Sequence, residues 1–190
     1  MILKSTLFLI LILSGACKMN SQQRSYADTS ATMVMAQTMT MTSNAFKNDE
    51  SIPQRYSCQG DNLSPALSWG NTPNGTNSYA LVCEDPDAPH GTFIHWVVYN
   101  IPAGEHGLGE NIPKKNVLPN GTRQGKNGAG QTGYSGPCPP AGKAHRYYFR
   151  LYALDSHINI AGDVTRDKLM SAIEGHVLGE GEIMGTYQRQ

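Results

Sequence analysis

Hydrophobic and polar positions along the chain predict a β-rich fold built from short strands. Between Thr38 and Thr42 polar and apolar side chains alternate strictly, which is typical of a strand with one buried face. Apolar runs at 78–84 and 93–101 indicate further strands, and the second run is rich in aromatic and β-branched residues. Two more strands are expected at 66–69 and 146–154.

A single clear helix is expected near the C-terminal end of the chain. Three apolar residues recur there at helical spacing: Leu169, Ile173 and Val177. Thr165 or Asp163 can cap its first turn, and residues 182–187 are expected to form a last helical turn after two interrupting glycines. The whole pattern predicts a mainly β fold, a β-sandwich or barrel with one or two short C-terminal helices.

The composition favours one domain and argues against a general nucleic-acid binder. A chain of 190 residues is long enough for one domain with a full core, and its 20 Gly and 11 Pro residues agree with many turns. Fifteen basic and fifteen acidic side chains leave a formal charge of zero, whereas a nucleic-acid binder normally has a basic excess. The Gly-rich segment 104–136 is long for a loop in a compact domain, which predicts a functional loop.

The first 17 residues have the pattern of an export signal. Lys4 precedes an apolar run at 6–13 that is too short to span a bilayer, and small residues at 14–16 lead to Cys17. Cleavage after the small residues would release a soluble protein. Alternatively Cys17 is the lipid-attachment cysteine of a bacterial lipoprotein, which is the route we favour. Either route predicts an exported protein, periplasmic or membrane-anchored, that contacts the membrane only through a lipid anchor.

Residues 18–37 are expected to form a flexible tether. The stretch consists mostly of Ser, Gln, Thr, Ala and Met, with no lasting hydrophobic period. Such a segment cannot bury enough apolar surface to offset the entropy lost on ordering. The folded domain is therefore expected to begin at Thr38 and to continue to residue 190.

Export would place the domain in an oxidising compartment, where cysteines can pair. Cys83 lies within the 78–84 run and is expected to behave as a small buried hydrophobe. Cys58 and Cys138 lie in turn-rich polar segments, so a bridge between them is one of the pairings that the sequence allows. Connectivity does not follow from the sequence alone.

A first candidate motif joins a proline-rich turn to a histidine. It runs from Asp85 through Pro89, with the order Asp-Pro-Asp-Ala-Pro, and leads to His95 in the next strand. Asp87 is expected to bond to amides inside the turn, which leaves Asp85 to face a ligand. A carboxylate beside His95 would favour an imidazolium that can bind phosphate. Taken alone, the turn is equally compatible with a plain connection between two strands, and a histidine in an apolar strand is more often a buried core residue than a ligand.

A second motif has the same layout. A Pro-rich rim at 136–140 precedes His145 and Tyr147, which alternate along a strand and therefore share one face. The simpler interpretation is a hairpin whose Tyr147 packs in the core. Two such motifs in one domain favour a shared pocket over two coincidences.

Other chemistries have weaker support in the sequence. The 133–136 segment lacks the second glycine of a nucleophile elbow. Asp85, His95 and His145 could form a metal site with two histidines and one carboxylate, but no short His pair anchors it. No phosphate loop, dinucleotide fingerprint or Cys-x-x-Cys pair is present, so neither a cofactor nor a metal is expected.

Several ordered motifs carry a resemblance to a known family. They are the 85–89 turn, His95 through Pro102, Gly136 through Pro140, His145 through Tyr147, Leu151 through Leu154 and Glu174 through Leu178. In these motifs the chain closely resembles the phosphatidylethanolamine-binding protein family, in its bacterial Raf-kinase-inhibitor-like (YbhB/YbcL) branch. The resemblance spans roughly Met41 to Tyr187 and implies a Greek-key β-sandwich over residues 38–190.

The resemblance also implies a pocket for phosphate, phosphorylated head groups or similar anions. The residues that match the pocket are Asp85, His95, Pro140, His145 and Tyr147, with Phe93 and Cys138 as further wall residues. The expected function is a non-enzymatic, regulatory binding protein whose partner is a small anionic ligand. Two alternatives are an inhibitor of a protease or kinase acting through the 104–136 loop, and a small hydrolase that uses the same Asp and His residues.

Overall fold

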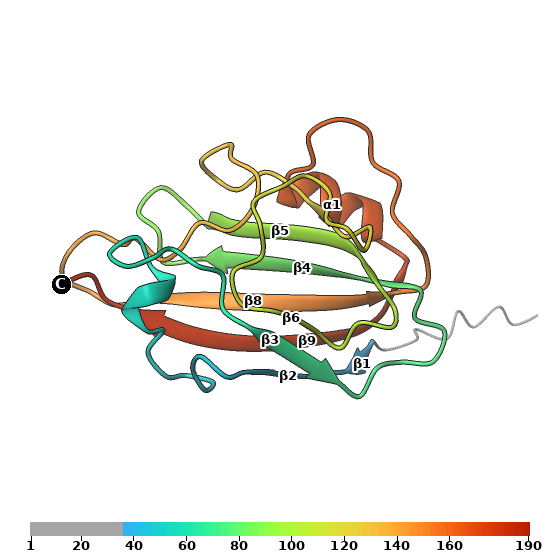
Figure 1. Ribbon diagram of the computed structural model, residues 1–190, viewed down its shortest axis with the longest axis horizontal. Coiled ribbons are helices and arrows are strands. Elements are labelled where there is room, and N and C mark those ends of the chain that lie inside the picture. The colour runs from blue at the N-terminus through green and yellow to red at the C-terminus, as the bar shows by residue number, and fades with distance from the viewer. Residues whose placement is uncertain (1–35) are drawn as a thin grey trace, which may run out of the picture. The chain divides into compact units, whose positions relative to one another are not determined.

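The computed structural model describes residues 36–190 (Figure 1). The expected export signal, Cys17 and nearly all of the expected tether lie outside the described residues. No helix within 36–190 is both long enough and apolar enough to cross a membrane.

Two sheets face each other across the main core (Figure 1). The larger has six strands in the order β1-β9-β8-β4-β5-β7: β1 (Gln37–Thr38), β4 (Ser78–Asp85), β5 (Phe93–Pro102), β7 (Arg123–Gln124), β8 (His145–Leu154) and β9 (Val177–Tyr187). The smaller has three in the order β2-β3-β6: β2 (Thr40–Ser43), β3 (Leu67–Gly70) and β6 (Gly107–Leu108). A 3-10 helix, η1 (Gln54–Tyr56), and one α-helix, α1 (Arg166–Ile173), complete the fold. The predicted mainly β sandwich is confirmed.

The central strand β4 is buried at all eight positions because both of its faces are covered. Tyr79 and Leu81 pack toward the smaller sheet, whereas Ala80 and Val82 pack toward α1 on the opposite face. The continuous apolar run at 78–84 is the sequence signal of this double coverage. β4 therefore supports two cores at once.

The helix begins where the sequence predicts. The Thr165 side chain caps α1 by accepting a hydrogen bond from the Lys168 amide, and Leu169 and Ile173 are its buried residues. The helix ends at Ile173, so Val177 belongs to the following strand rather than to α1.

The prediction of a last helical turn at 182–187 is wrong, because these residues belong to β9. The strand pairs with β8 along its whole length, from Leu154 opposite Val177 to His145 opposite Tyr187. Some inward-facing positions of β9 are glycines, and their lack of a side chain leaves room for the chain segment around Ile52 that packs against this face. A Cβ at Gly185 would lie 2.6 Å from the Cγ1 atom of Ile52. The glycines thus permit close packing of a strand.

One buried side chain helps to hold the 104–136 segment against the sheet. Gln124 in β7 accepts a hydrogen bond from the indole Nε1 of Trp96 at 2.8 Å. Its amide nitrogen donates to the carbonyl oxygens of Pro113 and Lys115 at 2.7 and 2.8 Å. The middle of this long segment is therefore held against β5 and cannot be treated as a free loop.

A disulfide joins Cys58, just after η1, to Cys138, with Cα atoms 5.4 Å apart. The bridge closes a separation of 80 residues, and it pairs the two turn-region cysteines. Cys83 is free and buried in β4, as its place in an apolar run predicts.

Replacing Gln124 by Ala should destabilise the domain. The substitution leaves the Trp96 indole N–H and two carbonyls without partners, which is expected to cost about 2–4 kcal/mol of unfolding free energy. Urea unfolding followed by Trp fluorescence measures the loss. Gln131→Ala, at an exposed glutamine whose side chain makes no hydrogen bond with the described residues, is the control. An equal effect of the two substitutions would contradict the assignment.

The disulfide should stabilise the domain mainly by restricting the unfolded chain. For a loop of 80 residues, chain entropy predicts a contribution of about 4.5 kcal/mol. The Cys58→Ser/Cys138→Ser variant should lose most of this free energy in urea unfolding. A reductant should lower the stability of the parent chain and leave that variant unchanged. A parent chain insensitive to reductant would argue against the bridge.

Candidate functional site

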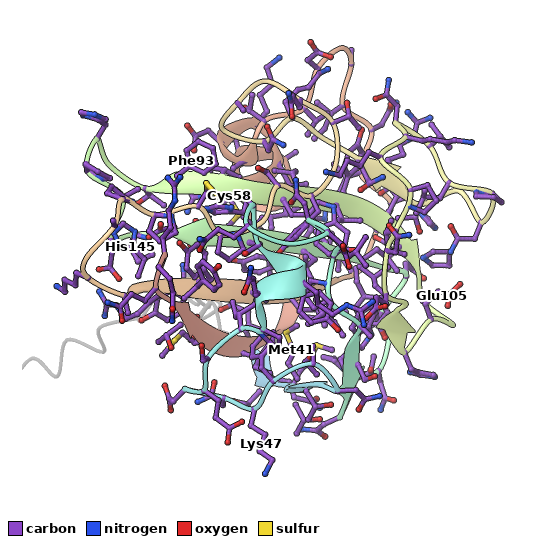
Figure 2. The ribbon with its side chains drawn as sticks, turned by 60° about the vertical axis from the view of Figure 1, so that its left-hand side comes forward. Met41, Lys47, Cys58, Phe93, Glu105 and His145 are labelled. Atoms are coloured by element: carbon purple, nitrogen blue, oxygen red, sulfur yellow. A yellow bond between two sulfur atoms is a disulfide. The ribbon has the colours of Figure 1, made fainter. Side chains whose placement is uncertain are left out.

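A hollow of about 190 Å³ lies at one end of the larger sheet, where the two sequence motifs meet. Its polar lining comes from Asp85, His95, Ser135 and His145. Its remaining lining is formed by Ala88, Pro89, Phe93, Gly136, Cys138, Pro139 and Pro140. In Figure 2, Phe93 and His145 lie at the same end of the strands, with the loops that carry the rim close by.

Strand pairing brings these distant residues together. β4 runs antiparallel to both β5 and β8, with Asp85 opposite Phe93 and Glu84 opposite Tyr148. The end of β4 therefore lies beside the first residues of both neighbours. A turn at 85–92 connects β4 to β5, so the Asp-Pro-Asp-Ala-Pro segment becomes one wall of the hollow.

Asp85 and His145 form a buried pair. His145 Nδ1 lies 2.8 Å from Asp85 Oδ2, and the two side chains are 10% and 5% exposed. A carboxylate can only accept here, so His145 Nδ1 carries the hydrogen. The other carboxylate oxygen, Oδ1, accepts from the Asp87 backbone amide at 2.8 Å. These bonds fix the carboxylate and leave His145 Nε2 as the ring nitrogen available to a ligand.

His95 is held in the same way by a different acceptor. Its Nδ1 lies 2.6 Å from the carbonyl oxygen of Ser135 and must therefore donate. The rings of Phe93 and Tyr147 flank it, with centroids 4.8 and 5.1 Å away. Burial lowers the pKa of His95, although the bond to Ser135 and the charge of Asp85 oppose this effect. Burial therefore favours the neutral form of His95, in which Nε2 is the free nitrogen.

Asp85 lines the hollow and Asp87 does not, but their hydrogen-bond partners differ from those expected. Asp85, not Asp87, accepts the amide inside the turn, and its imidazole partner is His145, 60 positions away, rather than His95. Asp87 instead binds Arg146 through the guanidinium Nε and Nη2 atoms and through the backbone amide. This pairing holds the pKa of the Asp87 carboxyl well below its usual range. Asp87 thus joins the turn to β8.

Tyr147 lies behind the hollow rather than in its wall. Its side chain is fully buried in the main core and packs edge-on against His95. It shares a face with His145, as alternation predicts, but lies two residues further into the sheet. Its hydroxyl has no hydrogen-bond partner within residues 36–190, and burial together with the charge of Asp85 raises its pKa. The prediction that Tyr147 donates directly to a ligand is not supported by this position.

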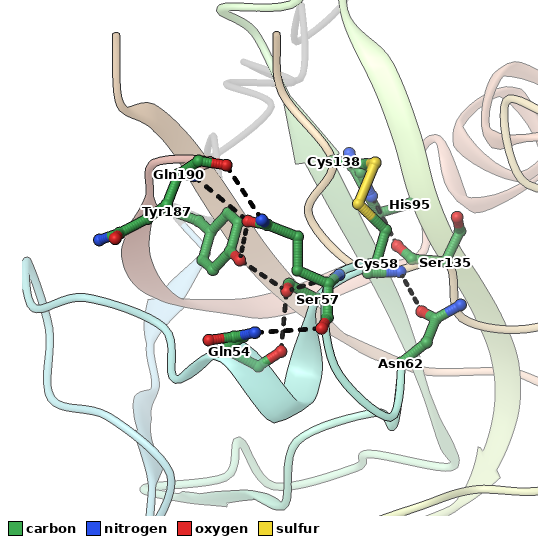
Figure 3. Close-up of a disulfide and its surroundings, with 11 residues drawn as sticks. Gln54, Ser57, Cys58, Asn62, His95, Ser135, Cys138, Tyr187 and Gln190 are labelled. Carbon is green, nitrogen blue, oxygen red and sulfur yellow. Dashed lines mark hydrogen bonds between the residues drawn. A yellow bond between two sulfur atoms is a disulfide. The ribbon is translucent and has the colours of Figure 1, made fainter. Parts of the chain in front are cut away.

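Several bonds hold the rim in place (Figure 3). The disulfide ties Cys138 to Cys58, and the Cys58 amide donates to the Pro137 carbonyl at 3.0 Å. The Gly136 amide donates to the side-chain oxygen of Asn62 at 2.7 Å. A Cβ at Gly136 would lie 2.3 Å from the Tyr56 carbonyl oxygen, so only glycine allows this close approach. The rim is therefore formed before any ligand arrives.

Six of the residues predicted for the pocket line the hollow: Asp85, Phe93, His95, Cys138, Pro140 and His145. Sequence reasoning missed Ser135, whose carbonyl fixes the His95 ring, and Asn62, which holds the rim. The position of Ser135 directly before the rim was the available signal. No group of three or more His, Cys, Asp or Glu side chains suited to a metal ion occurs in the part of the chain that the structure describes.

Comparison with known proteins places the chain in a family. The family model "Phosphatidylethanolamine-binding protein" matches residues 42–188. The UPF0098 protein of Methanothermobacter thermautotrophicus is 48% identical over 151 residues, which cover 80% of this chain and 99% of that protein. A UPF0098 protein of Chlamydia muridarum is 44% identical over 156 residues, 80% of this chain and 99% of the relative.

Solved structures share the fold. The crystal structure of a putative phosphatidylethanolamine-binding protein homologue from Chlamydia trachomatis has a TM-score of 0.74 and 40% identity, and the match covers 82% of this chain and all of that one. That of E. coli YbcL, described as a new member of the mammalian PEBP family, has a TM-score of 0.75 and 33% identity, over 80% of this chain and 99% of that one. Matched over most of its length in both sequence and structure, the chain belongs to the phosphatidylethanolamine-binding protein family.

Proposed function

We propose that the hollow binds a small anion, such as phosphate or a phosphorylated head group, and does so without transforming it. The observation that carries the proposal is the state of the two histidines. His95 and His145 both line the hollow, and in each ring Nδ1 already donates to a protein acceptor. Each ring therefore has only Nε2 left for a ligand.

Protonation of the rings determines what the hollow can bind. In a neutral ring Nε2 is an acceptor, and the Asp85 carboxylate then makes the hollow unfavourable for anions. A proton on Nε2 converts it into a charged donor, which forms stronger hydrogen bonds with anionic oxygens. At His145 the new charge would be paired with Asp85, 2.8 Å away. Anion binding is therefore coupled to proton uptake.

The size and the walls of the hollow indicate how large an organic group the bound anion can carry. Its volume of about 190 Å³ equals roughly six water molecules at about 30 Å³ each. Much of the wall is apolar, from Ala88, Pro89 and Phe93 on one side to Pro139 on the other. Such a space suits a phosphate that carries a small organic group, whereas two acyl chains would have to remain outside.

Inorganic phosphate and phosphoethanolamine should shift the ring resonances of His95 and His145 in NMR spectra of the full chain. His95→Gln and His145→Gln should each weaken binding at least tenfold, because each substitution removes a charged donor worth about 1.5–3 kcal/mol. His106→Gln, at an exposed histidine outside the hollow, is the matched control and should bind normally. Unchanged spectra of the parent chain at millimolar ligand would refute the proposal.

Affinity for sulfate should rise as the pH falls from about 7.5 to 5.5. The pKa of unliganded His95 lies below its ordinary value and the bound anion raises it, so binding takes up protons. At pH values above the pKa of the free ring, each proton taken up on binding makes the affinity rise about tenfold for every unit by which the pH falls. Sulfate keeps one charge state across this range, so isothermal titration calorimetry isolates the protein's contribution. An affinity that is flat or rises with pH would exclude proton-coupled binding.

A further inference from the structure

A second polar region lies at the other end of β5, on the opposite face of the larger sheet. Tyr99 packs in the cluster on the α1 side, whereas His95 contacts Tyr147 of the main core. The two positions are four residues apart on one strand, or about 13 Å. This region is therefore separate from the proposed anion hollow.

One arginine, Arg123, lines two adjoining hollows in this region. Arg123 lies opposite Tyr99 in the β5–β7 pairing, so their side chains are neighbours across the strands. Both residues line a hollow of about 230 Å³ and an adjoining one of about 100 Å³. The guanidinium of Arg123 makes no hydrogen bond and no ion pair with any other residue in 36–190. All five of its N–H donors are thus free to bind a ligand.

The segment of the chain that contains Arg123 has an excess of positive charge. Residues 111–154 contain seven Lys and Arg side chains and no Asp or Glu. Elsewhere in this stretch Arg146 is bound to Asp87, and Arg150 to Glu84 and Glu182. The lining of the larger hollow includes Arg123 and His157 and no carboxylate. It therefore has the charge and the donors that attract an anionic group.

The walls of the larger hollow are held rigidly. Asn100 adopts a left-handed backbone conformation, with φ of 54°. Its side-chain amide donates to the Ile158 carbonyl at 2.9 Å, and its side-chain oxygen accepts from the Ile158 amide at 2.8 Å. These two hydrogen bonds to one residue fix the 157–160 segment opposite Arg123. A site with fixed walls loses little entropy when a ligand binds.

The smaller hollow has the groups that recognise hydroxyls. Asn116, Thr132, Lys126 and Asp163 line it together with Arg123. The Thr132 hydroxyl donates to the Asn116 side-chain oxygen at 2.8 Å, and Lys126 Nζ lies 3.9 Å from Asp163 Oδ1. Amide, hydroxyl and carboxylate groups in one small space can donate to and accept from the hydroxyls of a sugar.

We propose that Arg123 is the centre of a second binding site, which takes a small phosphorylated sugar or polyol. The phosphate binds Arg123 and His157 in the larger hollow, because a planar guanidinium can contact two phosphate oxygens at once. The hydroxyls of the same molecule enter the smaller hollow and bind Asp163 and Asn116. This site does not depend on the function proposed for the His95–His145 hollow.

NMR titration of the full chain with three probes tests the proposal. Glucose 6-phosphate should shift the amide signals of Asn100, Gly125 and Ile158 saturably. Inorganic phosphate should shift them with at least tenfold weaker affinity, and glucose should leave them unchanged. The His95 and His145 ring signals report the other hollow in the same spectra, so the failure of either proposal is visible separately.

Three substitutions sharpen the test. Arg123→Gln should weaken glucose 6-phosphate binding at least tenfold, while Lys47→Gln, which removes one positive charge from an exposed position outside both hollows, should not. Asp163→Ala should weaken glucose 6-phosphate binding and leave the affinity for inorganic phosphate unchanged. Thermal unfolding confirms that each variant is folded. Equal binding by the parent chain and Arg123→Gln, or no shifts at Asn100 and Ile158, would overturn the proposal, leaving Arg123 as a solvated edge-strand charge.

Discussion

A buried carboxylate must be hydrogen-bonded, and this requirement at Asp85 determines the geometry of the candidate site. Asp85 ends a strand that is covered on both faces, so its charge has little access to water. One oxygen takes the amide of its own turn and the other takes His145 from the neighbouring strand. The turn, the first residue of β8 and the tautomer of His145 are all set by this one group. Its neighbour Asp87 then fastens the same turn to Arg146 from outside.

The rim adds a second constraint that is independent of charge. The disulfide, the Asn62 side chain and the close approach at Gly136 hold the 135–140 segment to the region around η1. Ser135 is part of this segment, and its carbonyl orients the His95 ring. The rim and the histidine are thus one unit, and a change that loosens the rim also frees the ring. A preformed wall of this kind lowers the entropy cost of binding a small ligand.

The sequence predicts the strands well where apolar residues mark both faces or alternate with polar ones. β4 and β5 are such cases, and so is the helix capped by Thr165. β9 was missed because three of its inward positions, Gly179, Gly181 and Gly185, have no side chain, so the alternation is invisible as hydrophobicity. The hydrogen-bond partners of Asp85 and Asp87 could not be predicted for another reason. Their partners, His145 and Arg146, come from a strand some 60 positions away, and no local rule of turn chemistry includes them.

Two adjacent carboxylates on β4 lie in different surroundings, and only one of them belongs to the candidate site. Glu84 and Asp85 are both buried, but alternation along the strand directs them to opposite faces. Glu84 is bound by Arg150 and lies 3.5 Å from Arg166, and arginine keeps its charge at every physiological pH. That cluster is therefore neutralised permanently and acts as a structural link between β4, β8 and α1. Asp85 is paired instead with His145, which lines the hollow beside it. The same type of residue thus supports a fixed contact on one face of the sheet and one wall of the candidate site on the other.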